Sequence, residues 1–506
     1  MLGFPVHQLL SFHWFELLGI HPVGVMPIRV HDTRRREKVE FSTMNPGRVN
    51  MYVCGVTVYD LCHLGHARCY LAFDLIHRWL EKSGYDVDYV QNFTDIDDKI
   101  ISVSSVEGVD FLEVANRNID DYFQVMDSLN VIRANSYPRV TETIPEIIEM
   151  IQDLIDKKHA YVTDDGVYFE IDTAPEKYGQ LTGQTLDMVR KGAGGRVENT
   201  GSGKRDHRDF ALWKSAKEGE PNWISPWGKG RPGWHIECSA MSLKHLGERF
   251  DIHGGGTDLV FPHHEAEIFQ SECCLGHEPV VQYWLHNGMI NIDGEKMSKS
   301  VGNFWTVRDA LEKIEPLVLR YALINAPYRQ PVDFNSVMID DSISHHGRLL
   351  NSYSKALHSS EGLRNDYTGV ENLVEAADRI RSGMDDDFNT RIALVEVQSV
   401  VKYLASLIDS DEKNPLLMSS YVQWLEEFAG EVLGILPTPE EAISRYEDKM
   451  LRRSEIAARV ESLLEMRKSA RASKNWVESD RIRDELTEIG VVVEDGPEGT
   501  KWRISE

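Results

Sequence analysis

The sequence predicts an α/β protein with a Rossmann-like, doubly wound parallel sheet, followed by an α-helical bundle and a small α+β domain. Strand-like and helix-like segments alternate from about residue 45 to 130 and again from about 231 to 310, which is typical of a parallel sheet built in two halves. Residues 340 to 435 instead show long helical periodicity with few strand signals. The 506 residues are enough for about three domains.

The first strand and helix of this pattern carry two histidines. Residues 49–54 are apolar and bounded by turn residues, which predicts a buried strand. From about Gly65, apolar residues recur at helical spacing as far as Gly84. His63 and His66 therefore stand at a helix N-terminus, where unpaired N–H groups suit a phosphate. An isolated pattern of this kind is more often a pair of histidines without function.

Two lysines follow a strand-like segment in the second half. Residues 283–292 are strand-like, Asp293-Gly294 turns the chain, and Lys296 and Lys299 come next on a loop. Such lysines can stabilise the negative charge that builds on a leaving pyrophosphate. A lone pair of lysines at this spacing is usually a solvated surface pair. The two signatures together, however, indicate that distant segments meet on one triphosphate, as in activation of a carboxylate by ATP.

Other segments have simpler patterns. A helix is predicted after Pro145, a strand pair from Tyr161 to Glu170, and a Gly-rich loop over residues 191–204. Beyond residue 440 the pattern predicts helices, and residues 490–503 read as a small hairpin.

Charge and cysteine content limit the class of protein. The net charge of −26 argues against a protein whose whole surface binds nucleic acid and against binding to anionic membranes. Ten basic and five acidic residues nevertheless lie between Lys449 and Arg483, which fits either a local RNA-binding face or a solvated helix. Six scattered cysteines do not form a disulfide framework, and no segment is apolar enough to span a membrane. We therefore expect a cytoplasmic protein.

Both signatures, in this order, resemble those of the class I aminoacyl-tRNA synthetases, and four longer stretches resemble the cysteinyl-tRNA synthetase family. These are residues 51–60, 92–99, 233–241 and 253–265. The resemblance extends over about residues 27–506, and Leu64 replaces the isoleucine usual in the first signature. It implies that L-cysteine reacts with Mg²⁺-bound ATP to give cysteinyl-adenylate, and that the cysteinyl group then moves to the terminal adenosine of tRNA-Cys.

The resemblance also implies the domain boundaries. Residues 27–330 would form the catalytic domain, with a connective insertion at about 140–230. The helical bundle would be 331–435 and the anticodon-binding domain 436–506. Residues 1–26 precede the family pattern, and either a real short extension or an artefact of the chosen start site explains them. The family expectation for assembly is a monomer.

One Zn²⁺ per chain is implied by the same resemblance. On the residues alone, a buried cysteine is more often an inert core residue than a metal ligand, and His264 could bind zinc as well as His263. Pro262 is well placed to open a helix on which His263 and Glu267 share a face. The family pattern selects Cys54, Cys238, His263 and Glu267. It implies that zinc binds the substrate thiol, for which a serine hydroxyl is a poor substitute. With four protein ligands, either the zinc becomes five-coordinate or Glu267 releases it.

The remaining roles follow from matched family positions. ATP binding and catalysis are expected from His63, Gly65, His66, Lys296 and Lys299, with Gly255 and Asp258 on the adenosine. Contacts to the substrate cysteine are expected from Gly55, Thr94, Trp234 and His253. A buried tryptophan is also commonly core, and Asp258 may be explained equally by capping of a turn.

Three alternatives share parts of this pattern. A ligase that joins cysteine to an amino sugar, as in the mycothiol pathway, would lack the C-terminal helices and basic segment. A non-catalytic RNA-binding paralogue would usually have lost one signature. A nucleotidylyltransferase with similar histidines would not explain the zinc set.

Overall fold

The computed structural model describes residues 27–184, 203–298, 302–360, 362–410, 414–496 and 499–504. The extension 1–26, most of the Gly-rich stretch and Lys299 lie outside these residues. The chain divides into two compact units. Unit 1 consists of residues up to 349 together with 366–403 and 423–436, and unit 2 consists of 350–365, 404–422 and 437–506.

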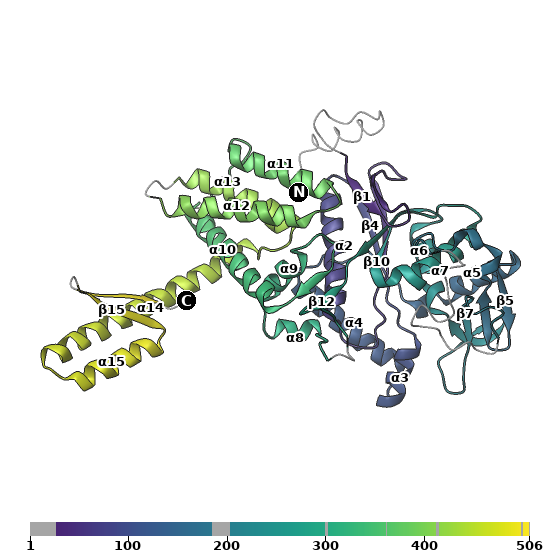
Figure 1. The fold of residues 1–506 in the computed structure, drawn as a ribbon, viewed down its shortest axis with the longest axis horizontal. Coiled ribbons are helices and arrows are strands. Elements are labelled where there is room, and N and C mark those ends of the chain that lie inside the picture. Colours follow the sequence, from purple (N-terminus) through teal and green to yellow (C-terminus); the bar gives the residue numbers. More distant parts are fainter. Residues whose placement is uncertain are drawn as a thin grey trace, which may run out of the picture. The chain divides into compact units, whose positions relative to one another are not determined.

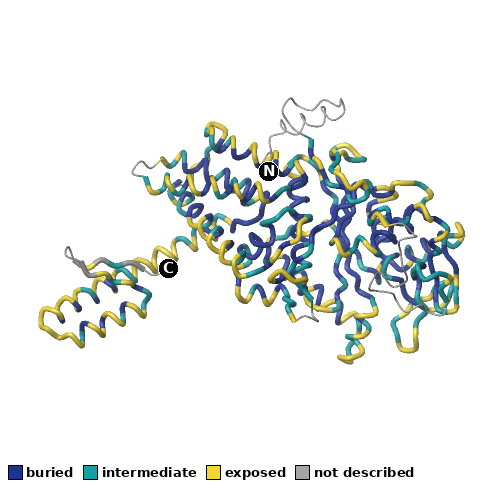
Figure 2. Tube along the Cα trace, viewed as in Figure 1, coloured by how far each residue is buried: buried dark blue, intermediate teal, exposed yellow. Residues whose placement is uncertain are grey.

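A four-stranded parallel sheet lies at the centre of unit 1, as predicted. It is formed by β3 (Arg48–Val53), β4 (Asp86–Gln91), β10 (Phe250–Gly256) and β11 (Val281–Asn287), in the order β11-β10-β3-β4. Dark blue marks these buried strands in Figure 2. The order changes direction between β3 and β10, and ligands of doubly wound sheets bind at the carboxyl ends of strands at such a point.

Helix α2 (Leu64–Lys82) connects β3 to β4 and confirms the predicted helix. His63 is its N-cap, and Gly84 follows its end with φ of 94°, a conformation that glycine adopts without strain. The helix packs closely on the sheet, since a Cβ added to Gly254 of β10 would come within 2.2 Å of the Phe73 ring. This packing fixes the helix N-terminus beside the ends of β3 and β10.

The chain between β4 and β10 forms several helices and a second sheet. Helices α3 (Asp98–Glu107), α4 (Phe111–Ser128) and α5 (Ile144–Asp156) come first. Five antiparallel strands follow in the order β5-β6-β7-β9-β8: β5 (Ala160–Thr163), β6 (Gly166–Phe169), β7 (Phe210–Ser215), β8 (Trp223–Ser225) and β9 (Gly228–Pro232). The predicted helix after Pro145 and the predicted strand pair are confirmed by α5 and by β5–β6.

Two further helices border the site. Helix α6 (Trp234–Leu246) precedes β10, and α7 (Glu265–Leu275) follows it after a π-helical turn, Val260–His264. Figure 1 shows α5, α6 and α7 gathered on the same side of β10 as the second sheet. Pro262 was expected in the first turn of a helix. Phe261 has extended backbone angles, and the helical backbone that continues into α7 starts directly after it, at Pro262 in the π-helical turn.

The segment with the lysine signature has its own small sheet. It contains β12 (Ile290–Ile292), β13 (Glu295–Lys296) and β14 (Val332–Phe334), and positive φ angles at Asp293 and Gly294 turn β12 into β13. Helices α8 (Val307–Leu311) and α9 (Pro316–Ile324) separate β13 from β14. A hairpin of β1 (Arg29–Asp32) and β2 (Glu37–Glu40) precedes the central sheet.

The rest of the described chain is largely helical, as predicted. Its helices are α10 (Ser336–Ser359), α11 (Glu371–Asp385), α12 (Thr390–Ile408) and α13 (Pro415–Leu425). The boundary between the two units passes through α10, α12 and α13.

The end of unit 2 also agrees with the sequence pattern. Helices α14 (Pro439–Ala472) and α15 (Trp476–Glu488) are followed by the paired strands β15 (Val491–Gly496) and β16 (Gly499–Ile504). A small buried cluster that includes Val460, Ile482 and Val491 holds these elements together, while most of α14 is exposed (Figure 2). Among the described residues, no helix is long and apolar enough to cross a membrane.

Candidate active site and metal centre

A cleft of about 730 Å³ opens at the carboxyl ends of the central strands. Most of the predicted site residues that the structure describes line it. They are Cys54, Gly55, His63, Gly65, His66, Thr94, Trp234, Cys238, Asp258, His263 and Lys296. Three others, His253, Gly255 and Glu267, lie behind its wall. The two signatures thus face the same cavity as the predicted thiol ligands.

His63 and His66 form a reciprocal cap at the start of α2. The His63 Nδ1 accepts from the His66 backbone N–H at 3.3 Å, and the His66 Nδ1 accepts from the His63 N–H at 3.4 Å. Their rings stack with centroids 3.6 Å apart. A neutral imidazole that accepts at Nδ1 carries its proton on Nε2. Burial also lowers the pKa of His66 well below its usual value, so this ring is a neutral Nε2–H donor.

Backbone pairing joins the two signature segments. The Leu64 N–H donates to the Trp305 carbonyl at 3.1 Å, and the Val307 N–H donates to the Cys62 carbonyl at 2.8 Å. The segment that follows the lysines therefore runs antiparallel to the segment that carries the histidines. This pairing explains how residues more than 230 positions apart come to line one cleft.

The described part of the lysine signature starts at Lys296, the last residue of β13, and we call the described residues 296–298 and 302–303 the signature loop. Lys296 is exposed and faces the cleft, whereas Lys299 is outside the described residues. Asn303 holds the described part of the loop: its Oδ1 accepts from the Ser298 N–H at 2.8 Å, and its Nδ2 donates to the Lys296 carbonyl at 3.3 Å. The sequence interpretation missed Asn303, because a lone asparagine after a loop is usually solvated.

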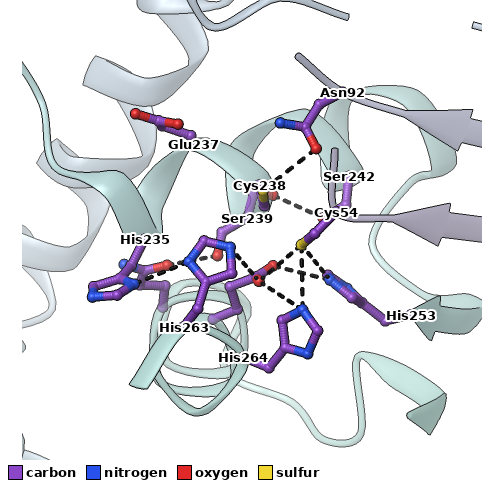
Figure 3. A network of polar contacts seen from close by, with 12 residues as sticks. Cys54, Asn92, His235, Glu237, Cys238, Ser239, Ser242, His253, His263 and His264 are labelled. Atoms are coloured by element: carbon purple, nitrogen blue, oxygen red, sulfur yellow. Dashed lines mark hydrogen bonds and ion pairs between the residues drawn. The ribbon is translucent and has the colours of Figure 1, made fainter. Parts of the chain in front are cut away.

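Four buried side chains converge beside the end of β3, and we call them the metal-donor cluster: Cys54, Cys238, His263 and Glu267. One ligand atom from each lies within 4.8 Å of all the others. Figure 3 shows Cys54, Cys238 and His263 pointing toward a common centre. His263 Nε2 is 3.2 Å from Glu267 Oε1, so the predicted shared face is realised across the junction between the π-helical turn and α7. Cys54, His253, His264 and Glu267 form a second group that meets the same distance limit.

The chemistry of the metal-donor cluster suits a cation. Burial raises the pKa values of the Cys54 thiol and the Glu267 carboxyl, and it lowers the pKa of His263. Glu267 Oε2 is buried and makes no hydrogen bond to any residue that the structure describes, although His253 Nε2 lies 3.4 Å from it. A divalent cation would stabilise the thiolates and the carboxylate that burial disfavours. This donor set could therefore hold a metal ion.

A layer of histidines surrounds the cluster on the side away from the cleft. His264 Nδ1 is 2.7 Å from His286 Nε2, and His264 Nε2 is 3.3 Å from Cys54 Sγ. His253 Nε2 is 3.4 Å from Cys54 Sγ (Figure 3), and its ring stacks on Trp284. On another side, His235 Nδ1 is 3.0 Å from His263 Nδ1. The contacts of His253 and His264 position the Cys54 thiol, and the contact of His235 orients the His263 ring, as hydrogen-bonding partners of metal ligands do.

The remaining predicted residues differ in their surroundings. Trp234 stacks on His263 with centroids 4.5 Å apart and faces the cleft. A Cβ added to Gly255 would come within 2.9 Å of the His264 ring, so this glycine leaves room for a side chain of the protein. Its neighbour Gly256 and Asp258 do line the cleft. The assignments of Gly255 and Asp258 to adenosine stay predictions.

Family comparisons agree with this geometry. Residues 40–344 match the model for the class I (C) tRNA synthetase catalytic domain, 379–437 match the DALR domain, and 453–503 match the cysteinyl-tRNA ligase anticodon binding domain. A cysteine–tRNA ligase of Chromobacterium violaceum is 47% identical over 94% of this chain and 99% of its own length. The chain belongs to the cysteine–tRNA ligase family. A cysteine–tRNA ligase from Shewanella sediminis is 44% identical with the same coverage of both chains.

Solved structures support the fold of this cysteine–tRNA ligase family member. A methionyl-tRNA synthetase of Mycobacterium tuberculosis in complex with methionyl-adenylate aligns with a TM-score of 0.56 at 16% identity, over 78% of this chain and 92% of its own. A putative arginyl-tRNA synthetase of Campylobacter jejuni aligns with a TM-score of 0.52 at 13% identity, over 77% and 94%. At these identities the likeness concerns the fold alone.

Proposed function

We propose that this chain is a cysteine–tRNA ligase. It activates L-cysteine with Mg²⁺-bound ATP and transfers the cysteinyl group to the 3′ adenosine of tRNA-Cys. One observation carries the proposal: the metal-donor cluster opens into the same cleft as both ATP signatures. A thiol held at the cluster and a triphosphate held at the signatures would share one cavity.

The two signatures act on the triphosphate. His63 and His66 donate from Nε2 to phosphate oxygens beside the N-terminus of α2. Lys296 and Lys299 stabilise the departing pyrophosphate when the cysteine carboxylate attacks the α-phosphate. Because positioning and charge stabilisation dominate such transfers, the backbone pairing between the segments is part of the catalytic apparatus.

We assign the metal to Cys54, Cys238, His263 and Glu267 rather than to the second group. Three of these four side chains face the cleft, whereas in the second group only Cys54 does. A metal that binds substrate needs a position open to the cavity. When bound, zinc supplies a site that a thiolate fills far better than a hydroxyl, which would exclude serine without an editing step.

The other side chains of the cleft hold cysteine and adenosine. Trp234 covers His263, and Thr94 and Gly55 form the opposite wall at the ends of β4 and β3. His253 supports the metal-donor cluster from behind, and Gly255 and Asp258 border the adenosine. We retain the predicted domain limits of 27–330, 331–435 and 436–506. The basic helices α14 and α15 contact the tRNA, and the protein acts as a cytoplasmic monomer.

Transfer of radioactive cysteine tests the proposal. The full chain is incubated with ATP, labelled cysteine and either tRNA-Cys or glucosaminyl-inositol, the acceptor class of the rival amino-sugar ligases. We expect label only on tRNA-Cys, in a base-labile ester. Label on the amino sugar would favour the rival enzyme, and absence of any cysteine-dependent reaction would favour a non-catalytic paralogue.

A further inference from the structure

One carboxylate of helix α4 contacts both segments that carry the ATP signatures, and the proposed mechanism does not use it. The Asp121 side chain is buried, with 4% exposure. Its Oδ2 accepts from the Cys62 backbone N–H at 3.4 Å, and its Oδ1 pairs with the Arg308 guanidinium. Cys62 directly precedes His63 of the first signature. Arg308 lies in α8, shortly after Asn303 of the signature loop.

Arg308 is attached to α4 at two points. Its Nε pairs with Asp121, and its Nη2 donates to Gln124 Oε1 at 2.8 Å. Positions 121 and 124 are three residues apart and so share one face of the helix. Among the described residues, Arg308 is the one cation that pairs with Asp121. Because a buried carboxylate without a cation is costly, Asp121 holds Arg308 on α4.

The ion pair lies beside the backbone pairing that joins the two signature segments. Cys62 is held from both sides, since its N–H donates to Asp121 and its carbonyl accepts from the Val307 N–H at 2.8 Å. The next residue, His63, pairs with the segment before α8, and its ring packs on Phe304 with centroids 5.3 Å apart. A shift of this junction would therefore move the histidines and the signature loop relative to each other.

We propose that Asp121 and Arg308 are positioning residues for the ATP-dependent step, because together they fix the separation of the two signatures. We call this pair the α4 clamp. The inference rests on the proposed function, in which both signatures act on one triphosphate. Neither side chain lines the cleft, so the α4 clamp acts through the backbone at Cys62 and Val307. Small displacements of groups that position a reacting substrate can cost much of the rate.

The two steps of the proposed reaction separate positioning from general support of the fold. The triphosphate is bound while the adenylate forms, whereas pyrophosphate has left before the cysteinyl group moves to tRNA. Loss of the α4 clamp should therefore slow the first step and spare the second. A pair that only stabilises the fold would change both steps or neither.

Arg308→Gln is the first variant, since this side chain is half-exposed and glutamine removes its charge. We expect single-turnover formation of adenylate to slow about tenfold, in the range of effects of misplaced reacting groups. Transfer to tRNA-Cys from adenylate isolated on the enzyme, the KM of cysteine and the zinc content should stay within twofold of wild type. Asp121→Asn should show the same pattern, and the double variant should lose no more than the larger single loss.

Asp127→Asn is the matched control. Asp127 also belongs to α4 and pairs with an arginine at 2.6 Å, but its partner Arg133 follows α4 and lies in neither signature segment. This variant should form adenylate within twofold of the wild-type rate. Slowing equal to that of Asp121→Asn would show that any loss of charge on α4 has this effect, and would overturn the assignment.

Hydrogen exchange gives a readout that does not depend on activity. The Leu64 and Val307 amides form the pairing beside the α4 clamp, so both should exchange faster in Arg308→Gln and unchanged in Asp127→Asn. Arg308→Lys keeps a cation beside Asp121 and should retain adenylate formation within about threefold of wild type. A loss in Arg308→Lys as large as in Arg308→Gln would contradict the role of the charge.

The Arg308 variants carry the test if Asp121→Asn does not fold. Equal slowing of both steps, additive losses in the double variant, or wild-type adenylate formation in Arg308→Gln would each refute the α4 clamp. If the wild-type protein shows no cysteine-dependent pyrophosphate exchange, the proposed function fails. If the wild-type protein is active and its variants form adenylate normally, only the α4 clamp fails.

Discussion

The metal-donor cluster and the signature loop face one cleft but are built in opposite ways. All four members of the cluster are buried, and His253 and His264 contact Cys54 from the side away from the cleft. Lys296 is exposed, and Asn303 is the residue that holds the described part of its loop. A preformed buried site suits selection of a substrate, whereas an exposed loop can move toward charge that develops during reaction. Substitutions in the cluster should therefore impair metal binding, whereas substitutions in the signature loop should slow adenylate formation.

Cys238→Ser should have the largest effect. Serine is a poor ligand for zinc, so the variant should lose the metal and, with it, cysteine activation by roughly 10³-fold or more. Metal analysis and pyrophosphate exchange measure the two losses. Cys273→Ser is the control, because Cys273 is a buried cysteine of α7 outside the cluster. A Cys238→Ser variant that retains the metal but loses activity would show that Cys238 is not a metal ligand.

Lys296→Ala and Lys299→Ala should impair the reaction without loss of the metal. Each is expected to slow adenylate formation by about 10²–10³-fold, the usual effect of removing a group that stabilises transition-state charge. Zinc content should be unchanged, because neither lysine belongs to the cluster. Single-turnover formation of adenylate is the measurement, and Lys244→Ala, on the surface of α6, is the control. Wild-type rates of pyrophosphate exchange in Lys299→Ala would rule out its proposed role.

Asn303→Ala should give a smaller effect of the same kind. Removal of two hydrogen bonds loosens the signature loop and should lower kcat for adenylate formation about tenfold, with the KM of cysteine unchanged. Asn222→Ala is a suitable comparison, since Asn222 makes one hydrogen bond on an exposed loop. A rise in the KM of cysteine without loss of kcat would show that Asn303 acts on the metal-donor cluster rather than on the signature loop.

Metal removal should lower stability, and more so at higher pH. Burial raises the pKa values of Cys54 and Glu267 in the metal-free protein, so their protonated forms compete with metal as the pH falls. As the pH rises past the unfolded pKa of a carboxyl, the metal-free protein loses the stability that protonated Glu267 provides. Chelation should therefore reduce Tm by several degrees more at pH 8 than at pH 6. An equal reduction at both values would contradict this reasoning.

The sequence predicted helices, strands and turns better than it predicted which side chains contact one another. Strand β3 and helix α2 follow from local periodicity, and the DG turn before Lys296 follows from turn chemistry. The grouping of Cys54 with Cys238 came from family resemblance, because cysteines 184 positions apart have no local spacing signal. The structure supplies the physical reason: β3 and β10 are neighbours, and α6 leads into β10.

Polar residues held by partners distant in sequence or across a loop were the least predictable part. Glu237, Asn92 and Asn303 gave no sequence signal, since each depends on a partner that only the folded chain brings near. Glu237 lies beside Cys238 in a matched stretch, yet nothing local indicates that it faces Thr94. His253 lies 3.4 Å from Cys54 Sγ, a contact that no local pattern indicated, and its assignment to the substrate cysteine stays a prediction.

Pyrophosphate exchange with cysteine and with serine, before and after metal removal, tests the central claim most directly. The account predicts exchange with cysteine alone, loss of that exchange when the metal is chelated, and its return when zinc is added. Exchange with cysteine that persists in metal-free protein, or exchange with serine at a comparable rate, would contradict selection of the substrate through a metal-bound thiol.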